Sequence, residues 1–433
     1  MLKKNRVFGK APICAAFCAV IAMVSVSGCM VGPDYSRPDT PADVKDGFVH
    51  AESQTRDIND VERIDDWWKG FGDARTEELV ERAFEHNYDL RAAAARVLQA
   101  QASLEQARGE QLPDISYNFS RSRGKRSFNF QGDRFSSLTT TFSQSISVSY
   151  AVDLFGRLRR AERAAWADLL AAQDNAQALV NLVVANVVKA RIDISTLQKR
   201  LEITRGSIAS WKETLDIVER RYEQGLVGPV DVRLARENLA AAREAEPQIE
   251  RALYRAEHAL DVLLGQKPGT SGRLENTLPE LPRLEPVPVG LPASLLDRRP
   301  DVRAAEMALM AGNERIGVSI ARLYPDLTFS GSYGREADRF SDLFIDETET
   351  YSAVLNLLQP IWQGGTIRAQ IKATKARYQE LAANYSATVL DALKEVEDAL
   401  VSENLLRDQL QFAKERFAES EAAEDLSRQR YRR

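Results

Sequence analysis

The chain has 433 residues and a formal net charge of −5 at neutral pH, with 44% hydrophobic and 28% charged residues. This length allows a large buried core and two or three domains. Without its basic first 28 residues the chain is more acidic and has no basic half, which argues against nucleic acid as the main partner.

The first 28 residues predict a secretory signal peptide. Lys3, Lys4 and Arg6 form a charged start, and the apolar run that follows is shorter than the roughly 20 residues that span a bilayer. The stretch "VSGC", which ends at Cys29, resembles the lipobox of bacterial lipoproteins, in which this cysteine becomes the acylated N-terminal residue. An ordinary signal peptide with an incidental cysteine is the alternative. All 3 cysteines lie at or before Cys29, so disulfides and thiol catalysis are excluded, and a covalent lipid on Cys29 is the only cofactor expected.

Residues 29–75 are expected to form an acylated N-terminal tether and an equatorial segment. Met30 rather than Asp follows the cysteine, which resembles lipoproteins sent to the outer membrane. One lipid chain binds membranes weakly whereas several chains anchor firmly, so an acylated Cys29 would hold the chain at outer membrane lipid.

Residues 76–266 predict a first structural repeat. A helix is expected over about 76–111, a β-hairpin at about 112–154, and a long helix from about 156 to 223. A tip turn at 224–228 then leads into a returning helix over about 229–264. Gly225 and Gly228 suit the reversal of the chain, and Pro229 suits the first position of the next helix.

The predicted strands alternate between apolar and small polar residues. On one side lie Ile115, Tyr117, Phe119, Phe142, Ile146, Val148, Tyr150 and Val152, and serine fills most of the other side. This pattern is typical of a transmembrane β-strand that lines a wet lumen. A soluble antiparallel sheet with one wet face is the alternative, and the exported start of the chain favours the membrane interpretation.

The two predicted hairpins supply too few strands for a closed barrel, because barrels need at least about eight. Open sheet edges cannot lie in lipid, since their backbone groups would be unpaired. A membrane location therefore requires several protomers to share one barrel, and three copies would supply twelve strands.

An apolar seam with alternating spacings of three and four follows the long helix from Trp166 to Tyr222, interrupted by Gln173 and Thr204. A second seam runs from Tyr378 to Phe417, with Glu403 as its exception. Such a sustained heptad pattern predicts a left-handed coiled coil, and the first long helix would extend for about 100 Å. The two shorter helices, stacked end to end beside it, would complete the wall of a tube.

A Pro-rich crossover at 267–292 separates the first repeat from a second one at 293–433, whose hairpin is expected at about 324–362. The strand pattern recurs at Leu327, Phe329, Tyr333, Tyr351, Ala353, Leu355 and Leu357. Tyr431 corresponds to Tyr222 of the first repeat, so the second repeat would stop at its tip. From this we expect a truncated form of a protein roughly forty or more residues longer.

Several motifs together resemble the TolC-like outer membrane factor family, and in particular its NodT-like lipoprotein branch. They are "CMVGPDYSRP" from Cys29, "WWKGFGDARTEELVERAFEHNYDLRAA" from Trp67, "RYEQGLVGPVDV" from Arg221, "LLDRRPDVRAAE" from Leu295 and "ARLYPDLTFSGSYG" from Ala321. The resemblance covers nearly the whole mature chain. It implies a mainly α fold with a transmembrane β portion, in which a homotrimer forms a 12-stranded β-barrel on a long α-helical barrel.

The resemblance also implies partners and sites. A periplasmic adaptor and an inner-membrane transporter, proton-driven in the favoured case, would be the partners of an outer membrane exit duct for small molecules. Arg221, Tyr222, Gly225 and Gly228 would form the periplasmic tip where the adaptor docks. Asp231 would be an acid at the pore mouth, and the alternative for Asp231 is helix capping, because an acid suits the first turn of a helix.

The sequence gives less support to other functions and sites. The histidines His50, His86 and His258 lack metal-ligand spacing, so no metal site is expected. Arg121, Arg123, Lys125 and Arg126 form a basic cluster at the outer end of the first hairpin, either a solvated loop or a contact with lipopolysaccharide phosphates. No nucleotide-binding or nucleophile motif indicates an enzyme. One-step protein secretion is the alternative function, and a periplasmic coiled-coil scaffold is less favoured.

Overall fold

The computed structural model describes residues 30–38, 48, 66–130, 133–270, 272, 274 and 298–432. The predicted signal peptide, Cys29 and most of the Pro-rich crossover lie outside the described residues. The chain divides into two compact units. Unit 1 comprises Met1–Pro41, Leu98–Ala172 and Arg303–Val389, and unit 2 comprises Ala42–Val97, Gln173–Val302 and Leu390–Arg433.

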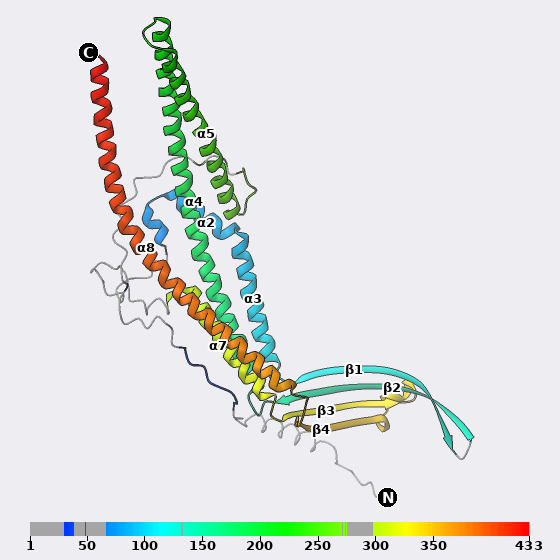
Figure 1. The fold of residues 1–433 in the computed structure, drawn as a ribbon. Helices are drawn as coiled ribbons and strands as arrows, with labels where there is room; N and C mark the ends of the chain where they lie inside the picture. Colours follow the sequence, from blue (N-terminus) through cyan, green and yellow to red (C-terminus); the bar gives the residue numbers. More distant parts are fainter. Residues whose placement is uncertain are drawn as a thin grey trace. The chain divides into compact units, whose positions relative to one another are not determined.

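The same order of elements, a helix, two strands and a long helix, occurs twice (Figure 1). The first pass contains α2 (Ala74–His86), α3 (Tyr88–Gly109), β1 (Asp114–Phe130), β2 (Asp133–Val152), α4 (Arg157–Glu223) and α5 (Pro229–Leu263). The second contains α7 (Pro300–Ala321), β3 (Asp326–Ala337), β4 (Glu349–Leu358) and α8 (Thr366–Arg432). The two long helices, α4 and α8, each have 67 residues. No helix within the described ranges is long and apolar enough to cross a membrane.

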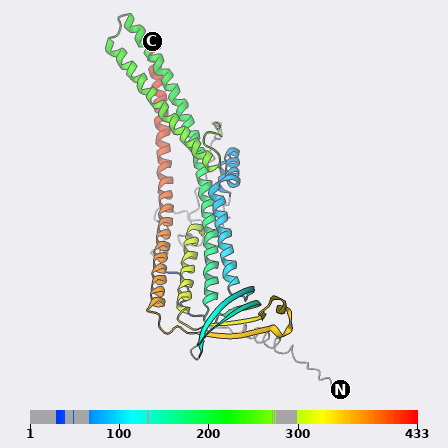
Figure 2. The ribbon, with the colours of Figure 1, turned by 90° about the vertical axis from the view of Figure 1, so that its right-hand side faces the viewer.

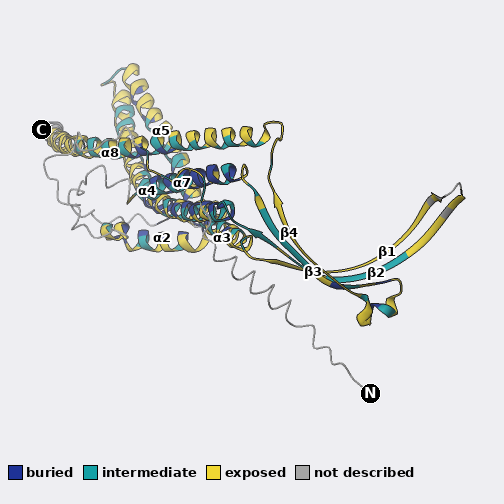
Figure 3. Ribbon diagram, turned by 90° about the horizontal axis from the view of Figure 1, so that it is seen from below, coloured by how far each residue is buried: buried dark blue, intermediate teal, exposed yellow. Residues whose placement is uncertain are grey.

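A four-stranded antiparallel sheet in the order β1-β2-β3-β4 forms the strand part of unit 1. β1 pairs with β2 along its whole length, up to the pair Phe130 and Asp133. β3 accompanies β2 only as far as the pair Ala337 and Phe142. The β1–β2 hairpin therefore continues alone beyond the four-stranded part, as Figure 3 shows.

The helices of unit 1 pack through small residues. Ala164, Ala167 and Ala171 of α4 are buried at helical spacing. On α7, a Cβ atom added to Gly312 would lie 2.7 Å from Leu381 Cδ1 of α8. Small side chains at these positions let the helix backbones approach closely, so the helices of unit 1 pack tightly.

Unit 2 has an apolar core of its own. α4 contributes Val183, Val187, Ile194 and Leu201 of the predicted seam, and α2 and α5 contribute Leu79, Val80, Leu253 and Leu260. In both Figure 1 and Figure 2, α5 runs back beside α4 after the turn that joins them. Burial of each of these aliphatic side chains stabilises the folded state by about 1.5–3 kcal/mol relative to leaving it exposed.

The apolar seam predicted for α4 accounts for only one of the two rows of buried residues on that helix. Trp166 and Trp211, both on that seam, are exposed in the single chain. A second row is buried at Arg160, Ala164, Ala167, Ala171 and Asp174, and again at Val184, Val188, Arg191 and Ser195. This second row includes two arginines and an aspartate, which is why a search for apolar spacing missed it.

The single helix predicted over about 76–111 is wrong, because the chain forms two helices that are separated at Asn87. The Asn87 Oδ1 atom accepts hydrogen bonds from the backbone N–H groups of Asp89 and Leu90, at 2.9 and 3.0 Å. Its Nδ2 atom donates to the Leu263 carbonyl at 2.9 Å. Asn87 thus caps the start of α3 and joins it to the end of α5.

Candidate functional site

The register of the sheet brings the predicted apolar side chains of all four strands onto one face. Directly paired residues of antiparallel strands share a face, and the pairs include Tyr117 with Ile146, Ile146 with Tyr333, and Tyr333 with Tyr351. This face is called the apolar face below. The prediction that the apolar residues named for the strands share one face is confirmed.

The opposite face of the sheet, called the polar face, carries rows of serine. Hydroxyl pairs across neighbouring strands hydrogen-bond to each other: Ser116 with Ser147 at 2.9 Å, Ser120 with Ser143 at 2.8 Å, and Ser332 with Ser352 at 2.8 Å. These hydroxyl groups satisfy one another while they keep capacity for water. The polar face is therefore wettable, and these pairs carry no formal charge.

Aromatic rings mark the end of the apolar face at which the β1–β2 hairpin continues alone. Phe340 lies in the short helix η3 (Phe340–Phe344). The centre of its ring is 6.3 Å from that of Phe119 and 5.8 Å from that of Phe142. The ring centres of Phe340 and Phe344 are 5.7 Å apart. The connection between β3 and β4 thus folds over the apolar face at this level.

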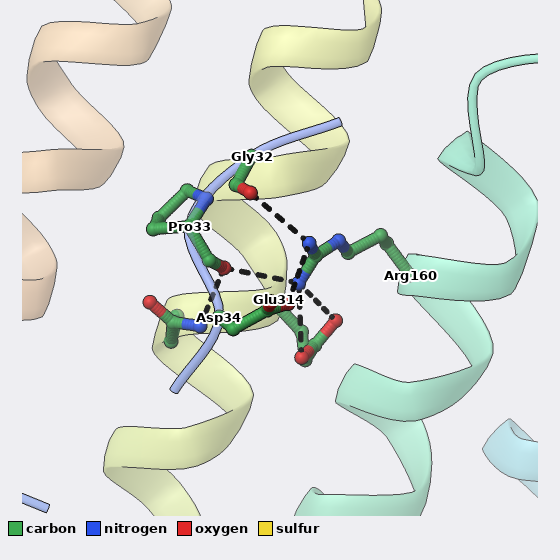
Figure 4. Close-up of polar contacts among 6 residues, drawn as sticks. Gly32, Pro33, Asp34, Arg160 and Glu314 are labelled. Carbon is green, nitrogen blue, oxygen red and sulfur yellow. Dashed lines mark hydrogen bonds and ion pairs between the residues drawn. The ribbon is translucent and has the colours of Figure 1, made fainter. Parts of the chain in front are cut away.

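The N-terminal segment 30–38 is held against α4 and α7 by a buried arginine (Figure 4). The Arg160 side chain is 1% exposed, and its Nη1 atom donates to both carboxylate oxygens of Glu314, at 3.2 and 3.1 Å. Nη1 also donates to the Pro33 carbonyl at 3.1 Å, and Nη2 donates to the Gly32 carbonyl and to Asp34, both at 3.3 Å. One guanidinium group therefore joins three separate stretches of the chain.

A second carboxylate fixes the next part of the same segment. Arg37 donates to Glu306 of α7 through two nitrogens, at 2.8 and 2.6 Å, and the Tyr35 hydroxyl donates to Glu306 at 3.2 Å. Burial, and then the Glu306 charge, raise the pKa of Tyr35 above its ordinary value. The tyrosine therefore remains a neutral donor at physiological pH.

Two glycines allow the close approach on which this arrangement depends. A Cβ atom on Gly32, whose φ is +106°, would lie 2.7 Å from the Gly317 Cα atom of α7. A Cβ atom on Gly317 would lie 2.7 Å from the Arg160 side chain. Both positions need the absence of a side chain, and Gly32 also needs a backbone conformation that other residues rarely adopt.

Ion pairs connect α4 to its neighbours on both sides within unit 1. Arg108 and Gln111, at and just after the end of α3, donate to Glu162 of α4 at 2.9 and 2.7 Å. These hydrogen bonds, that of Gln111 first, hold the pKa of Glu162 below its usual range. On the other side, Arg315 of α7 pairs with Asp168 of α4, where burial raises the pKa of the carboxyl group although Arg315 opposes that rise.

The predicted tip turn joins α4 to α5. Gly225 has a φ of +69°, and its backbone N–H donates to the Tyr222 carbonyl at 2.9 Å. The Leu226 N–H donates to the Arg221 carbonyl at 2.9 Å, so the end of α4 is capped by the turn itself. Tyr222, Leu226 and Val230, in and beside this turn, are exposed apolar side chains.

Asp231 caps the start of α5. Its Oδ2 atom accepts a hydrogen bond from the Gly228 N–H at 2.8 Å, and Pro229 occupies the first helical position. This is the capping role that was weighed for Asp231. A role at the pore mouth is compatible with it, because the side chain is exposed, and remains a prediction.

The structure also contains a buried ion pair that the sequence did not indicate. Arg191 of α4 is fully buried and pairs with Asp73 at 3.2 Å. Asp73 at the same time caps α2 by accepting from the Arg75 N–H and the Thr76 hydroxyl, at 3.2 and 2.7 Å. The only signal in the sequence is an aspartate at a helix start, since Arg191 lies more than a hundred residues away.

The predicted site residues thus fall in separate places. Arg221, Tyr222, Gly225, Gly228 and Asp231 lie together at the tip turn. Cys29 lies outside the described residues, but its neighbour Met30 lies against Gly156 and the Val31 N–H donates to the Phe155 carbonyl at 3.2 Å. The segment that follows Cys29 therefore lies at the junction between the sheet and α4.

Comparison with known proteins places this geometry among export channels. The family model described as "Outer membrane efflux protein" matches residues 79–266 and 291–433. A toluene efflux pump outer membrane protein, TtgF of Pseudomonas putida, is 29% identical over 96% of this chain and 87% of the relative. A pyoverdine export outer membrane protein, OpmQ of Pseudomonas aeruginosa, is 31% identical over 90% of this chain and 84% of the relative.

A solved structure has a similar fold. The outer-membrane channel OprN superimposes with a TM-score of 0.79 at 30% sequence identity, covering 88% of this chain and 84% of that channel. The likeness thus extends over both passes of the chain.

Proposed function

Because this chain belongs to the outer membrane efflux protein family, we propose that three copies of it form one continuous exit duct, a 12-stranded β-barrel on an α-helical barrel. The chain is an outer membrane component of an efflux pump, and its family consists of channel proteins. The trimer, the route of the cargo and the roles of individual residues make up the proposal.

The observation that carries the proposal is an amphipathic sheet with two open edges. β1 and β4 are the outer strands of the four-stranded sheet, and each pairs on one side only. In hydrocarbon, each unpaired backbone group costs several kcal/mol. Further copies of the chain remove both edges when β4 of one copy pairs with β1 of the next, and three copies of four strands give twelve.

The chemistry of the two faces indicates which one would face lipid and which one the lumen of the barrel. The apolar face, with Ile146, Tyr333 and Leu355, suits lipid, and the serine-rich polar face suits a water-filled lumen. These serine pairs hold neutral hydroxyl groups and make no strong selection among solutes. We expect the cargo to be small molecules, selected by an inner-membrane transporter, proton-driven in our proposal.

The tip is the surface proposed for the periplasmic adaptor. Arg221, Tyr222, Gly225 and Gly228 lie in or beside a rigid, capped turn, and the exposed Tyr222 and Leu226 offer apolar area for a partner. Asp231 beside them would place a carboxylate at the pore mouth. At the other end, acylation of Cys29 would anchor the chain in the membrane.

Cysteine cross-linking between edge strands tests the trimer. The chain has no cysteine after Cys29, so cysteines introduced by Ser116→Cys in β1 and Ser352→Cys in β4 are the only free thiols of the acylated chain. We scan Ser352 and its polar-face neighbours Thr350 and Asn356 against Ser116 and expect one combination to give covalent trimers on oxidation.

The matched control combines Ser147→Cys in β2 with Ser352→Cys in β4. Ser147 lies on the same face but in an inner strand, so this pair should give no covalent trimer. Purified full-length protein should also conduct ions across planar bilayers. Monomers that fail to cross-link in every combination, with no conductance, would show that the proposal is wrong.

A further inference from the structure

We propose that the β1–β2 hairpin carries a binding site for the phosphate groups of lipopolysaccharide, formed by Arg121, Arg123 and Lys125. The inference rests on the proposed membrane barrel and goes beyond it, because a conduit needs no such site. It starts from the register of the hairpin rather than from its composition.

The basic cluster at the end of the first hairpin is divided between the two faces of the sheet. Arg121, Arg123 and Lys125 alternate in step with Tyr117 and Phe119, so they continue the apolar face. Their partners on β2 are Phe142, Thr140 and Leu138. Arg126, the fourth member of the cluster, points to the polar face and pairs with Ser137.

The three basic residues begin where the lipid-facing surface ends. The aromatic rings of Phe119, Phe142 and Phe340 gather at this level, as aromatic residues do at the boundary between hydrocarbon and headgroups. The Arg121 guanidinium carbon lies 5.5 Å from the centre of the Phe142 ring, directly past this boundary. β3 also ends here, at Ala337.

The position of the three basic residues along the strands favours a contact with the outer leaflet of the membrane. The helices adjoin the opposite end of the sheet within unit 1, where β1 follows α3 and β2 leads into α4. The hairpin end therefore faces away from the periplasm. On the outward face beyond the boundary, an exposed apolar stem with a charged end can reach a headgroup phosphate, as arginine and lysine do at interfaces.

The positive charge of this stripe is not neutralised by the part of the chain that the structure describes. Arg121, Arg123 and Lys125 are exposed, and none of the ion pairs among the described residues includes them. Beyond the four-stranded part, the described side chains of β1 are exposed, and those of β2 are exposed over residues 136–139 (Figure 3). Side chains two residues apart on one face repeat about every 7 Å, so neighbouring residues can hold separate phosphate groups.

Two acidic residues in and beside the connection between β3 and β4 are engaged away from the stripe. Asp346 is paired with Arg335 at 3.0 Å, and Glu336 lies opposite Ser143 on the polar face. The outward face of the hairpin therefore presents cations above an aromatic boundary, which is the charge complement of a phosphorylated glycolipid.

The experiment measures binding of lipid A by the purified full-length protein in detergent. Bisphosphorylated lipid A is titrated into the wild type and into a triple variant with Arg121→Gln, Arg123→Gln and Lys125→Gln. We expect the triple variant to bind about a hundredfold more weakly, because each cation near a charged surface contributes about fivefold. Removing both phosphates from lipid A should weaken binding by the wild type in the same way.

A matched pair of single variants separates the outward face from net charge. Arg123→Gln and Arg126→Gln remove one identical charge from the same strand, three residues apart, on opposite faces. We expect Arg123→Gln to weaken binding about fivefold and Arg126→Gln to leave it within about twofold of the wild type.

Three results would overturn the proposal: equal loss in the two single variants, unchanged binding by the triple variant, or equally tight binding of phosphatidylglycerol, which would assign the stripe to any anionic lipid. Conductance in planar bilayers is measured on the same samples. A conducting wild type without stripe-dependent binding defeats only this inference, whereas a wild type that neither conducts nor forms trimers defeats the proposed duct.

Discussion

Arg160 shows how much a single buried residue can organise. Its guanidinium group lies between α4, α7 and the N-terminal segment, and the Glu314 carboxylate that balances it is 9% exposed. A buried charge is tolerated only when a partner and hydrogen bonds replace its water, and here Pro33, Gly32 and Asp34 accept further hydrogen bonds from the two Nη atoms. Nothing near Arg160 in the sequence indicates this role, because its partners are more than a hundred residues away.

We predict that Arg160→Met destabilises the protein by about 3–5 kcal/mol, because Glu314 is left as an unpaired buried charge. The measurement is the denaturant dependence of unfolding in detergent. The double variant Arg160→Met with Glu314→Leu should recover part of the loss, since it removes both charges.

The control for Arg160 is Arg157→Met, three residues earlier on α4. Arg157 is partly exposed and lies 3.8 Å from Asp326, so its loss should cost no more than about 1 kcal/mol. Equal effects of the two single variants would contradict the assignment of Arg160 as the residue that holds the N-terminal segment.

At the scale of elements, local signals succeeded where the chain reverses and failed where a helix breaks. Gly225, Gly228 and Pro229 specify the α4–α5 turn by their own backbone preferences, and the structure places the turn where they predict it. Asn87 also has a preference for helix starts, but the Ala-rich segment around it reads as one continuous helix. Its bond to Leu263 of α5 belongs to tertiary structure.

We predict that Gly225→Ala destabilises unit 2 by about 1–2 kcal/mol, because a side chain opposes the left-handed conformation. A Cβ atom there meets nothing within 4 Å, so the backbone conformation alone accounts for the cost. The readout is thermal unfolding followed by circular dichroism.

Gly206→Ala is the matched substitution within α4, where a Cβ atom also meets nothing within 4 Å. It should stabilise the helix by about 0.5–1 kcal/mol, because alanine favours a helix interior. If both variants shift the unfolding temperature in the same direction, the explanation by backbone conformation fails.

For the whole molecule, the apolar seam of α8 is satisfied only in part by its own chain. Tyr385, Val389 and Ala392 are buried, whereas Leu406 and Leu410 on the same seam are exposed. Exposed aliphatic residues at heptad spacing are typical of a helix that packs against another helix in an assembly. This fits the proposed α-helical barrel, in which further copies cover the seam.

We predict that Leu406→Ser with Leu410→Ser lowers the temperature at which the proposed trimer dissociates, because in that trimer the apolar area lost would lie between subunits. Native electrophoresis after stepwise heating measures this. Arg407→Ser with Gln411→Ser changes two exposed residues with the same spacing on the same helix and should leave the oligomer unchanged. Seam variants that resist heat like the wild type would remove α8 from the subunit contact.

The sequence by itself determined the elements and their faces. Period-two alternation and heptad spacing are local patterns, so they predicted the strands, the long helices and the common apolar face that the register then confirmed. Only the tertiary structure decided the break at Asn87, the pairing of Arg191 with Asp73, and the place of residues 30–38 against Arg160. These depend on buried charges and hydrogen bonds between distant segments, whose partners are chosen when the chain folds because an unpaired polar group inside the protein costs too much.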